Sequence, residues 1–423
     1  MENAYLKIAE QSKKYGTVQN LMHLVNAENL KYQHKLQSRR KATGIDGIGK
    51  ANYEENLDEN ISRLIGSMKN FSYKPQSVKR VSIPKIGSDK LRPLGIPAYE
   101  DKLVQGVFAN ILNSIYENKF KEFSYGFRPN KSCHCALKEL NNVMVRNKVG
   151  FIVDADISGF FDNVNHEWLV KFLENDIKDK NFIRYIKRFL QSGIMEQGKY
   201  IESDKGTPQG GVISPILANI YLHYVLDLWF EKKIQNKFWG QAFIVRYADD
   251  FVCCFQHENE AKDFYRLLKE RLGKFGLKLS EEKSRIIRFG RYAKEHGSKE
   301  TFDFLGFTHI NATNKNGKYI VVHFTSKTKM TAKREAVKTW LHENRHIDKK
   351  ELVMKLNIKL IGHYRYYGVT GNFRKLQTFE RYAIKELFKT LNRRSQRKLT
   401  WEKFNKFIEY NPIAKSKIYV PLY

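Results

Sequence analysis

The chain has 423 residues, 42% of them hydrophobic, and carries 75 Lys and Arg against 45 Asp and Glu, a formal net charge of +30. This length and composition are typical of two or three globular domains and exclude a largely disordered chain. A positive charge this large opposes compaction unless a polyanion neutralises it, which favours a nucleic-acid partner. No apolar run approaches the roughly 18 residues of a membrane span, and residues 1–16 lack the apolar centre of a signal peptide. We therefore expect an intracellular protein without a membrane partner.

The first quarter of the chain is predicted to be helical, followed by one hairpin. Residues 1–75 are polar and helical in pattern, with a glycine-rich turn at 43–47. Residues 78–97 alternate, which predicts a basic β-hairpin that turns at 87–89. Residues 101–120 carry apolar side chains at a period of 3.6, which predicts a buried helix.

The middle of the chain alternates strands, loops and a helix. Residues 150–157 predict a buried strand, and a helix should begin at Ser214-Pro215 and run to about residue 232. The apolar, aromatic run 243–255 predicts two strands, with the polar pair Asp249-Asp250 at the tight turn between them.

The four cysteines do not form a metal-binding pattern. They occur as two close pairs, Cys133 with Cys135 and Cys253 with Cys254, and neither spacing matches the paired C-x-x-C of a zinc knuckle. The second pair continues an apolar strand, where cysteine packs as a small apolar residue. We expect all four to be structural thiols.

After about residue 313 the chain becomes helical and strongly basic. Residues 327–398 contain 20 Lys and Arg against 6 Asp and Glu, a net charge of +14. A solvated helical face is the ordinary explanation of such charge, but a surplus this one-sided favours contact with phosphates. The segment His342-Glu-Asn-Arg-His346 matches the H-E-x-x-H zinc-protease pattern, yet no third ligand is evident, so we interpret it as a polar helix end.

Two carboxylate clusters are the candidate chemistry. Adjacent acids at a hairpin tip, Asp249 and Asp250, repel each other and lose hydration, so a fold rarely keeps them there for stability. A hard divalent cation such as Mg²⁺ relieves that repulsion and prefers carboxylate oxygens. Asp156 ends the strand 150–157, and together the three acids would hold two Mg²⁺ ions for in-line nucleotidyl transfer. Taken alone, each cluster also fits a bland interpretation, a strand-end acid or a solvated turn.

Four blocks of sequence, in this order, resemble the reverse transcriptases encoded by bacterial and organellar group II introns. They are Asp156-x₄-Phe161, GTPQGGVISP at 206–215, YADD at 247–250 and FLGF at 304–307. Further blocks are TGIDG, LRPLGIP and YGFRPNKS in the N-terminal part, and YYGVTGN and LNRRSQRKLTW in the C-terminal part, so the resemblance covers nearly the whole chain. It implies an α+β right-hand polymerase, with fingers and palm built on an antiparallel sheet and an α-helical thumb.

The resemblance also implies domain limits, activity and partners. Residues 1–78 would be a helical RNA-binding extension, 79–313 the fingers and palm, 314–400 the thumb or maturase domain, and 401–423 a tail. The implied activity is RNA-directed DNA synthesis from dNTPs with two Mg²⁺ ions, Mn²⁺ being an alternative. The implied partners are structured intron RNA, which a maturase binds to aid splicing, an RNA template–DNA primer duplex and a DNA target. The expected location is the bacterial cytoplasm, in association with the nucleoid.

Residue by residue, the resemblance makes Asp156, Asp249 and Asp250 the catalytic metal ligands, with the Ile157 carbonyl as a further ligand. Phe161 would be the steric gate that excludes a 2′-hydroxyl. Other positions would hold the incoming dNTP or the primer. They are Lys85 and Arg92 on the triphosphate, Gln209 in the nucleotide pocket, Lys283 beside the departing pyrophosphate, and the primer grip Phe304, Leu305, Gly306 and Phe307.

The chain departs from many family members at its C-terminal end. It stops 22 residues beyond Trp401 without a Cys/His cluster, so we expect the type that lacks an endonuclease. Three alternatives stay open: a domesticated enzyme of phage defence or DNA repair, a retron-like enzyme that copies a small partner RNA, and a non-catalytic RNA-binding splicing factor. The intact acids at 156, 249 and 250 oppose the last of these.

Overall fold

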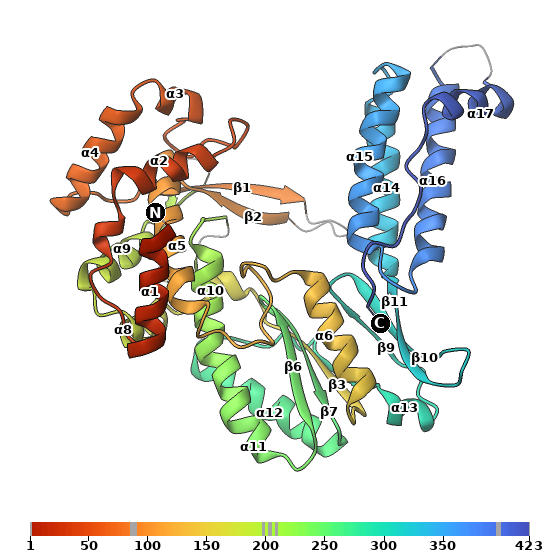
Figure 1. The fold of residues 1–423 in the computed structure, drawn as a ribbon, viewed down its shortest axis with the longest axis horizontal. Helices are drawn as coiled ribbons and strands as arrows, with labels where there is room; N and C mark the ends of the chain where they lie inside the picture. The colour runs from red at the N-terminus through yellow and green to blue at the C-terminus, as the bar shows by residue number, and fades with distance from the viewer. Residues whose placement is uncertain are drawn as a thin grey trace.

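A computed structural model describes residues 2–84, 91–196, 199–201, 205–207, 210–394 and 399–422. The protein is α+β, as expected. The described residues form three sheets, with strand orders β2-β1-β4-β5, β6-β7-β3-β8 and β11-β10-β9, and all pairings are antiparallel except β1 with β4. Figure 1 shows an N-terminal lobe and an upright group of C-terminal helices, which stand apart above a base that contains the central sheet.

The N-terminal lobe is built around one buried helix, α5 (Tyr99–Tyr116). The predicted helix 101–120 is therefore confirmed, although it begins two residues earlier and ends at Tyr116. The predicted hairpin is also confirmed, because β1 (Val78–Pro84) pairs antiparallel with β2 (Leu91–Ile96). Its predicted turn at 87–89 lies outside the described residues. The helices that precede the hairpin are α1 (Glu2–Tyr15), η1 (Met22–Leu24), α2 (Ala27–Leu36), α3 (Lys50–Glu54) and α4 (Leu57–Lys69).

The central sheet separates two hydrophobic cores. Its strands are β6 (Ala242–Tyr247), β7 (Asp250–Phe255), β3 (Phe151–Asp156) and β8 (Arg285–Arg288). Successive side chains of a strand point to opposite faces. Cys253 accordingly joins the core of the N-terminal lobe, while Cys254 joins the core beneath the C-terminal helices. All four cysteines are unpaired thiols, and these two are completely buried as small apolar residues.

The segment between β3 and the central hairpin is mostly helical. Helix α10 (Ser214–Leu222) begins at the predicted Ser214 and continues through a wider helical winding to Lys237, five residues past the predicted end. Helix α12 (Glu258–Lys274) then covers the sheet. The remaining elements between Cys133 and Lys237 are α6 (Cys133–Arg146), α7 (Phe160–Asn163), α8 (His166–Asp176), α9 (Lys180–Leu190), β4 (Ile194–Glu196), β5 (Lys199–Ile201), η2 (His223–Asp227), η3 (Phe230–Ile234) and α11 (Gln235–Lys237).

The strands that precede the C-terminal helices form one sheet across the expected domain boundary. Strand β10 (Phe307–Thr313) pairs with β11 (Tyr319–Thr325) across the expected boundary at 313 and 314. The chain end returns to this region, because Val369 bridges Val420 and the Asn141 side chain donates a hydrogen bond to the Leu422 carbonyl at 3.2 Å. The other elements are α13 (Arg291–Glu295), β9 (Thr301–Phe304), α14 (Lys327–Glu343), α15 (Lys349–Tyr367), α16 (Phe373–Asn392) and α17 (Trp401–Tyr410).

The helices bear on two possibilities raised by the sequence, a zinc-protease helix and a membrane span. Helix α14 ends at Glu343, so His342 and His346 do not lie on successive turns of one helix, as the H-E-x-x-H pattern requires. Within the described ranges no helix is long and apolar enough to span a membrane. The described residues therefore give no support to a zinc-protease helix.

Two histidines in the β10–β11 sheet predict acid sensitivity. His309 and His323 are cross-strand partners with rings 4.7 Å apart, and both are completely buried. Burial lowers the pKa of His323 to about 4. An unfolded chain, with an ordinary histidine pKa near 6.5, binds this proton more readily than the folded chain, so stability is lost as the pH falls from about 6.5 towards 4.

We expect the free energy of unfolding to fall by about 2 kcal/mol between pH 7 and pH 5 because the unfolded chain binds a proton at His323. Urea denaturation at the two pH values measures this loss, and a His323→Phe variant should show a smaller loss than the wild type. The exposed His346 offers a matched control, since His346→Phe should leave the loss unchanged. An equal pH dependence in all three proteins would contradict the prediction.

Candidate active site

The register of the central sheet brings the predicted acids together. Asp156, the last residue of β3, lies directly opposite Asp250 of β7. The turn between β6 and β7 contains Ala248 and Asp249, whereas Asp250 already pairs with Tyr247 as the first residue of β7. The prediction that both acids occupy the turn was therefore wrong in this detail. Ala248 takes the positive φ, +58°, that closes so tight a turn.

Burial, together with neighbouring carboxylates, raises the pKa of Asp250, Asp249 and Asp154. Burial, followed by the charges of Asp154, Asp249 and Asp156, raises the pKa of Asp250 to about 7. Burial also raises the pKa of Asp249, which the neighbouring Arg92 opposes, and raises that of Asp154 to about 6. Asp154 was given no role from the sequence. Its spacing of two residues from Asp156 on one strand was the available signal, because such residues share a face.

Lys283 forms an ion pair with Asp156. Its ammonium Nζ is 2.5 Å from Oδ2 of Asp156, and both side chains are partly exposed. The turn that carries Lys283 is docked on the strand end, since the Ser280 amide donates to the Asp156 carbonyl at 2.8 Å and the Asp156 amide donates to Ser284 Oγ at 3.2 Å. The cation is thus directed at a catalytic candidate by backbone contacts.

The donor set suits a hard divalent cation. Asp156, Asp249 and Asp250 offer carboxylate oxygens, the ligands that Mg²⁺ prefers, and the carbonyl of Ile157 directly follows. In the part of the chain that the structure describes, no group of three His, Cys, Asp or Glu side chains is already assembled as a metal centre. Asp156 instead pairs with Lys283. The chemistry of the three acids therefore fits a site for a divalent cation, which would compete with Lys283 for Asp156.

A buried ion pair supports the turn between β6 and β7. Arg246 and Asp227 are both completely buried, and the guanidinium binds the carboxylate through two hydrogen bonds, Nε to Oδ1 at 2.7 Å and Nη2 to Oδ2 at 2.6 Å. The remaining nitrogen, Nη1, donates to the Ala248 carbonyl at 3.0 Å and to Asn219 Oδ1 at 3.1 Å. One arginine therefore fixes the backbone of the turn that carries Asp249.

A glycine loop closes over the same turn. Asn219 donates to the Gly126 carbonyl at 2.6 Å. A Cβ atom on Gly126 would lie 2.3 Å from the Ala248 amide nitrogen, a distance that real contacts do not reach. Neither Arg246 nor its partners Asp227 and Asn219 were predicted from the sequence. The signal was a charged residue, Arg246, inside an otherwise apolar strand, which must find a buried partner.

The loop 206–215 joins the strand end to β2. The Thr207 amide donates to the Phe161 carbonyl at 2.7 Å, and the Phe161 side chain is 9% exposed at the edge of the N-terminal core. Gly210 has a φ of +110°, and a Cβ there would lie 2.3 Å from the Gly95 carbonyl oxygen of β2. Arg92 of β2 is near enough to affect the pKa of Asp249. Lys85 and Gln209 lie outside the described residues.

The expected primer grip touches the acids. Leu305 and Gly306 form the turn between β9 and β10, with φ values of +50° and +79°. The Leu305 amide hydrogen-bonds the Asp250 carboxylate, and its carbonyl accepts from the Tyr366 hydroxyl at 3.0 Å. Phe304 and Phe307 are buried on either side. The structure thus links the acids to helix α15 through one turn.

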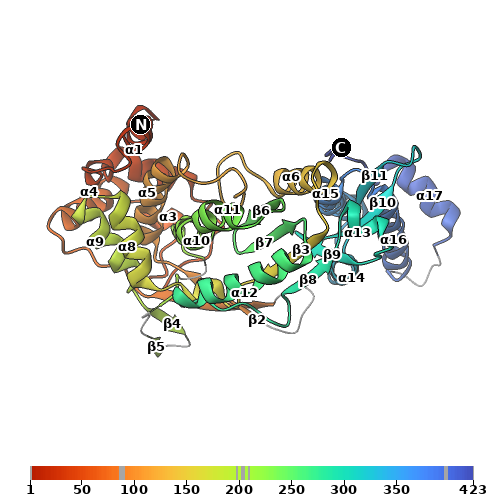
Figure 2. The ribbon, with the colours of Figure 1, turned by 90° about the horizontal axis from the view of Figure 1, so that it is seen from below.

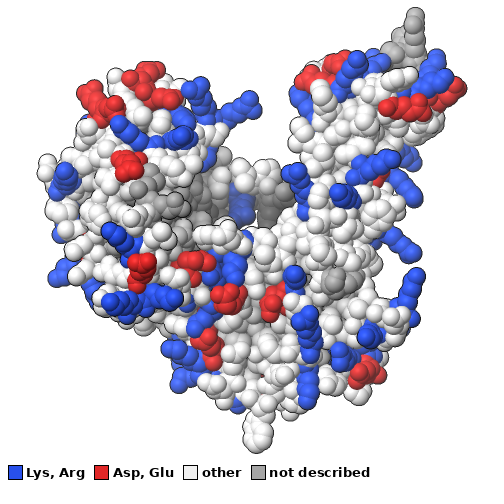
Figure 3. Space-filling view, viewed as in Figure 1, with Lys and Arg blue, Asp and Glu red and all other residues white. Residues whose placement is uncertain are grey.

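A cavity of about 770 Å³ extends from Asp250 along the C-terminal helices. It passes the turn at Leu305 and is lined on α14 and α15 by three lysines, Lys329, Lys333 and Lys359. Figure 3 shows the molecule hollowed between the N-terminal lobe and these helices, with Lys and Arg on both sides. The acids therefore open onto a basic groove.

Comparison with known proteins shows which family the chain resembles. The model of the reverse transcriptase (RNA-dependent DNA polymerase) family matches residues 83–309, more than half of the chain. The group II intron-encoded protein LtrA of Lactococcus lactis subsp. cremoris is 35% identical over 258 residues, covering 57% of this chain and 43% of LtrA. Protein YkfC of Escherichia coli (strain K12) is 32% identical over 237 residues, covering 49% of this chain and 62% of YkfC.

The chain belongs to the reverse transcriptase family. Within it, the chain is similar to group II intron-encoded proteins and, at 25% identity over 180 residues, to the mitochondrial nuclear intron maturase 2 of Arabidopsis thaliana, covering 33% of this chain and 24% of that protein. It spans less than half the length of LtrA. The resemblance drawn from the sequence motifs is confirmed.

Proposed function

We propose that the protein is an RNA-directed DNA polymerase of the group II intron type, which also binds intron RNA as a maturase. One observation carries the catalytic part: Asp156 lies opposite Asp250 and beside the turn of Asp249, inside the segment that matches the family. A non-catalytic splicing factor would have no need to gather three half-buried acids at a common edge.

The fold suits a right-hand polymerase. We assign the extension to residues 1–78, the fingers and palm to 79–313, the thumb to 314–400 and the tail to 401–423. The hollow between the N-terminal lobe and the C-terminal helices would hold the template–primer duplex, and the lysine-lined cavity beside Asp250 would form part of its wall. Its lysines suit backbone phosphates, which account for most of the affinity of proteins for nucleic acids.

The acids would hold the catalytic metal. Asp156, Asp249, Asp250 and the Ile157 carbonyl would bind two Mg²⁺ ions, with Mn²⁺ as an alternative. Bound there, the ions would activate the primer 3′-hydroxyl and stabilise the charge that develops on the leaving pyrophosphate. The Leu305 amide lies beside the Asp250 carboxylate, and Arg246 holds the turn of Asp249, so the chain would support two of the three ligands from neighbouring segments.

The cations near the acids would handle the triphosphate. Arg92 suits it as a planar fork, and Lys85 and Lys283 as point charges. Lys283 lies on Asp156. When a metal takes that carboxylate, the released ammonium would stand beside the site and could neutralise or protonate the departing pyrophosphate. Gln209 would complete the nucleotide pocket, and Phe304 to Phe307 the primer grip.

Phe161 should act as the gate against ribonucleotides. The Thr207 amide donates a hydrogen bond to the Phe161 carbonyl, which holds the Phe161 backbone beside the loop 206–215. A Phe161→Ala variant should lower the ratio of kcat/KM for a dNTP over the matching rNTP by at least about tenfold, since the ring excludes the 2′-hydroxyl by contact. Single-nucleotide incorporation measures this ratio, and an unchanged ratio would remove the gate role.

The maturase role rests on the intron-encoded relatives and on the net charge of +30. Structured RNA is recognised largely through its backbone and shape, which a basic surface can contact. DNA at a target site would supply the primer for copying that RNA.

Primer extension on matched RNA and DNA templates tests the proposed activity. The wild type should extend a DNA primer on the RNA template with Mg²⁺ and dNTPs, and a chelator should stop it. A splicing assay with a group II intron RNA tests the maturase part separately. Absence of RNA-templated extension would reject the polymerase, and splicing unchanged by the protein would reject the maturase.

A further inference from the structure

A second groove lies on the outer side of the N-terminal lobe, along α8 and α9. Its main cavity has a volume of about 820 Å³. Two smaller hollows, of about 420 and 310 Å³, continue it: one shares Lys178 and Lys180 with the main cavity, and the other shares Glu174, Lys187 and Gln191. We call this continuous surface the α8–α9 groove. One lining residue, His166, contacts the Gly206 carbonyl of the loop 206–215 at 2.6 Å, and the other lining residues lie outside the active site described above.

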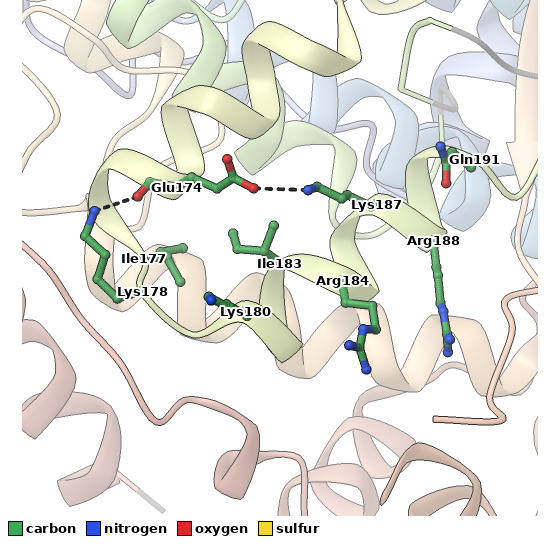
Figure 4. A pocket seen from close by; sticks show the side chains of 9 residues that line it. All are labelled: Glu174, Ile177, Lys178, Lys180, Ile183, Arg184, Lys187, Arg188 and Gln191. Atoms are coloured by element: carbon green, nitrogen blue, oxygen red, sulfur yellow. Dashed lines mark hydrogen bonds and ion pairs between the residues drawn. The ribbon is translucent and has the colours of Figure 1, made fainter. Parts of the chain in front are cut away.

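The charge of the groove is strongly positive. Among the described residues, six cations line it against three acids. Of the acids, Asp179 accepts four backbone amides, Glu174 pairs with Lys187 at 3.0 Å (Figure 4), and Glu167 is exposed. Lys180 and Arg184 lie one turn apart on α9 and form no hydrogen bond or ion pair with any described residue. Charges of this kind remain available to a polyanion. The cations that line the groove are Lys171, Lys178, Lys180, Arg184, Lys187 and Arg188.

Two exposed aromatic rings accompany these cations. Phe71 has a φ of +56°, which is costly for a bulky side chain, yet its ring is 38% exposed. The Arg184 guanidinium lies 4.4 Å from that ring centroid, and Arg188 donates to the Phe71 carbonyl at 2.9 Å. Trp168 of α8 is 36% exposed, and the ammonium of Lys171, a cation that lines the groove, lies 4.9 Å from its ring centroid.

This combination is the chemistry of single-stranded nucleic acid binding. Cations follow the phosphates, and aromatic rings and arginine planes stack on unpaired bases. An acidic peptide would use the cations but would leave the two aromatic rings without a role. The strain at Phe71 also fits a function, because the fold maintains an unfavourable backbone to present an exposed ring.

The α8–α9 groove is remote from the hollow between the N-terminal lobe and the C-terminal helices, which we call the catalytic groove. In both Figure 1 and Figure 2, α8 and α9 lie at the opposite end of the molecule from α14 and α16. A duplex that occupies the catalytic groove would leave the α8–α9 groove accessible. We infer that the α8–α9 groove is a second RNA site, which binds a single-stranded RNA segment while the catalytic groove is occupied. This binding does not require that the protein copies RNA.

Binding of a labelled 20-nucleotide oligouridylate tests the inference. Fluorescence anisotropy would follow it with the full chain already saturated by an unlabelled RNA–DNA template–primer duplex. The double variant Lys180→Glu/Arg184→Glu should bind at least tenfold more weakly than the wild type. Its slope of log affinity against log salt should be shallower by about 1.4, the value for two lost phosphate contacts on a single strand.

The chain offers a matched control on α12. Lys262 and Arg266 are exposed and already paired with Glu258 and Glu270, so Lys262→Glu/Arg266→Glu changes the net charge equally at another surface. This control should bind oligouridylate like the wild type. Extension of a short template–primer should be unchanged in both double variants.

A Phe71→Gly variant separates stacking from a structural role. Glycine accepts the positive φ, so the urea midpoint should not fall, while affinity for oligouridylate should drop at least threefold. The inference is overturned if the groove variant binds like the α12 control, or if the template–primer duplex abolishes oligouridylate binding to the wild type.

Discussion

An Asp250→Asn variant should fold normally and lose RNA-templated DNA synthesis by about 10³-fold. Asparagine keeps the size of the side chain and an oxygen that can accept the Leu305 amide, so the pairing of β7 with β3 is retained. It removes a negative charge from the metal site. Metal stabilisation of a transition state is worth several kcal/mol, and about 4 kcal/mol corresponds to about 10³-fold in rate. Single-turnover primer extension measures the loss.

Asp162 provides the control for this prediction. It is an exposed acid in α7, one residue beyond Phe161, and it is not one of the three acids at the edge of the central sheet. Asp162→Asn should extend primers within about twofold of the wild type, a rate difference worth about 0.4 kcal/mol. Equal losses in the two variants would mean that general charge, and not the position of Asp250, controls the activity.

Replacing Arg246 with methionine should destabilise the protein by about 3 to 5 kcal/mol. The change leaves Asp227 completely buried without its cation, and breaking one partner of a buried pair costs about this much. It also releases the Ala248 carbonyl, so the turn of Asp249 loses its support. Urea denaturation measures the stability, and primer extension of the folded fraction measures the activity.

Two further variants separate these effects. The double variant Arg246→Met/Asp227→Leu removes both charges, so it should recover much of the stability while the activity stays low. The surface pair of Arg266 and Glu270, 2.9 Å apart and more than half exposed, is the control, because Arg266→Met should cost less than about 1 kcal/mol. Stability of Arg246→Met equal to that of Arg266→Met would contradict the account.

Local patterns predicted the strands and helices that carry the site. The 3.6-residue period identified α5, and the apolar runs identified β3, β6 and β7 with the acids at their ends. The motifs then identified the family, which composition alone could not do. The exact turn was misplaced, because a run of apolar and polar letters does not show whether Ala248 or Asp250 closes a two-residue loop.

Contacts between distant segments were not predictable in the same way. Asp227 meets Arg246, and Tyr366 meets Leu305, across 19 and 61 residues of chain. Each partner looks ordinary in its own segment, and only the folded register shows that it supports the acids. The α8–α9 groove was missed for a related reason: the positive φ of Phe71 and its position under Arg184 are properties of the backbone path.

Single-nucleotide incorporation opposite a defined RNA base tests the central claim most directly. The wild type and Asp249→Asn would each be mixed with a DNA primer annealed to an RNA template, Mg²⁺ and one dNTP at a time. The account predicts that the wild type adds only the complementary dNTP and that Asp249→Asn adds almost none. Addition that ignores the template base, or equal addition by both proteins, would contradict it.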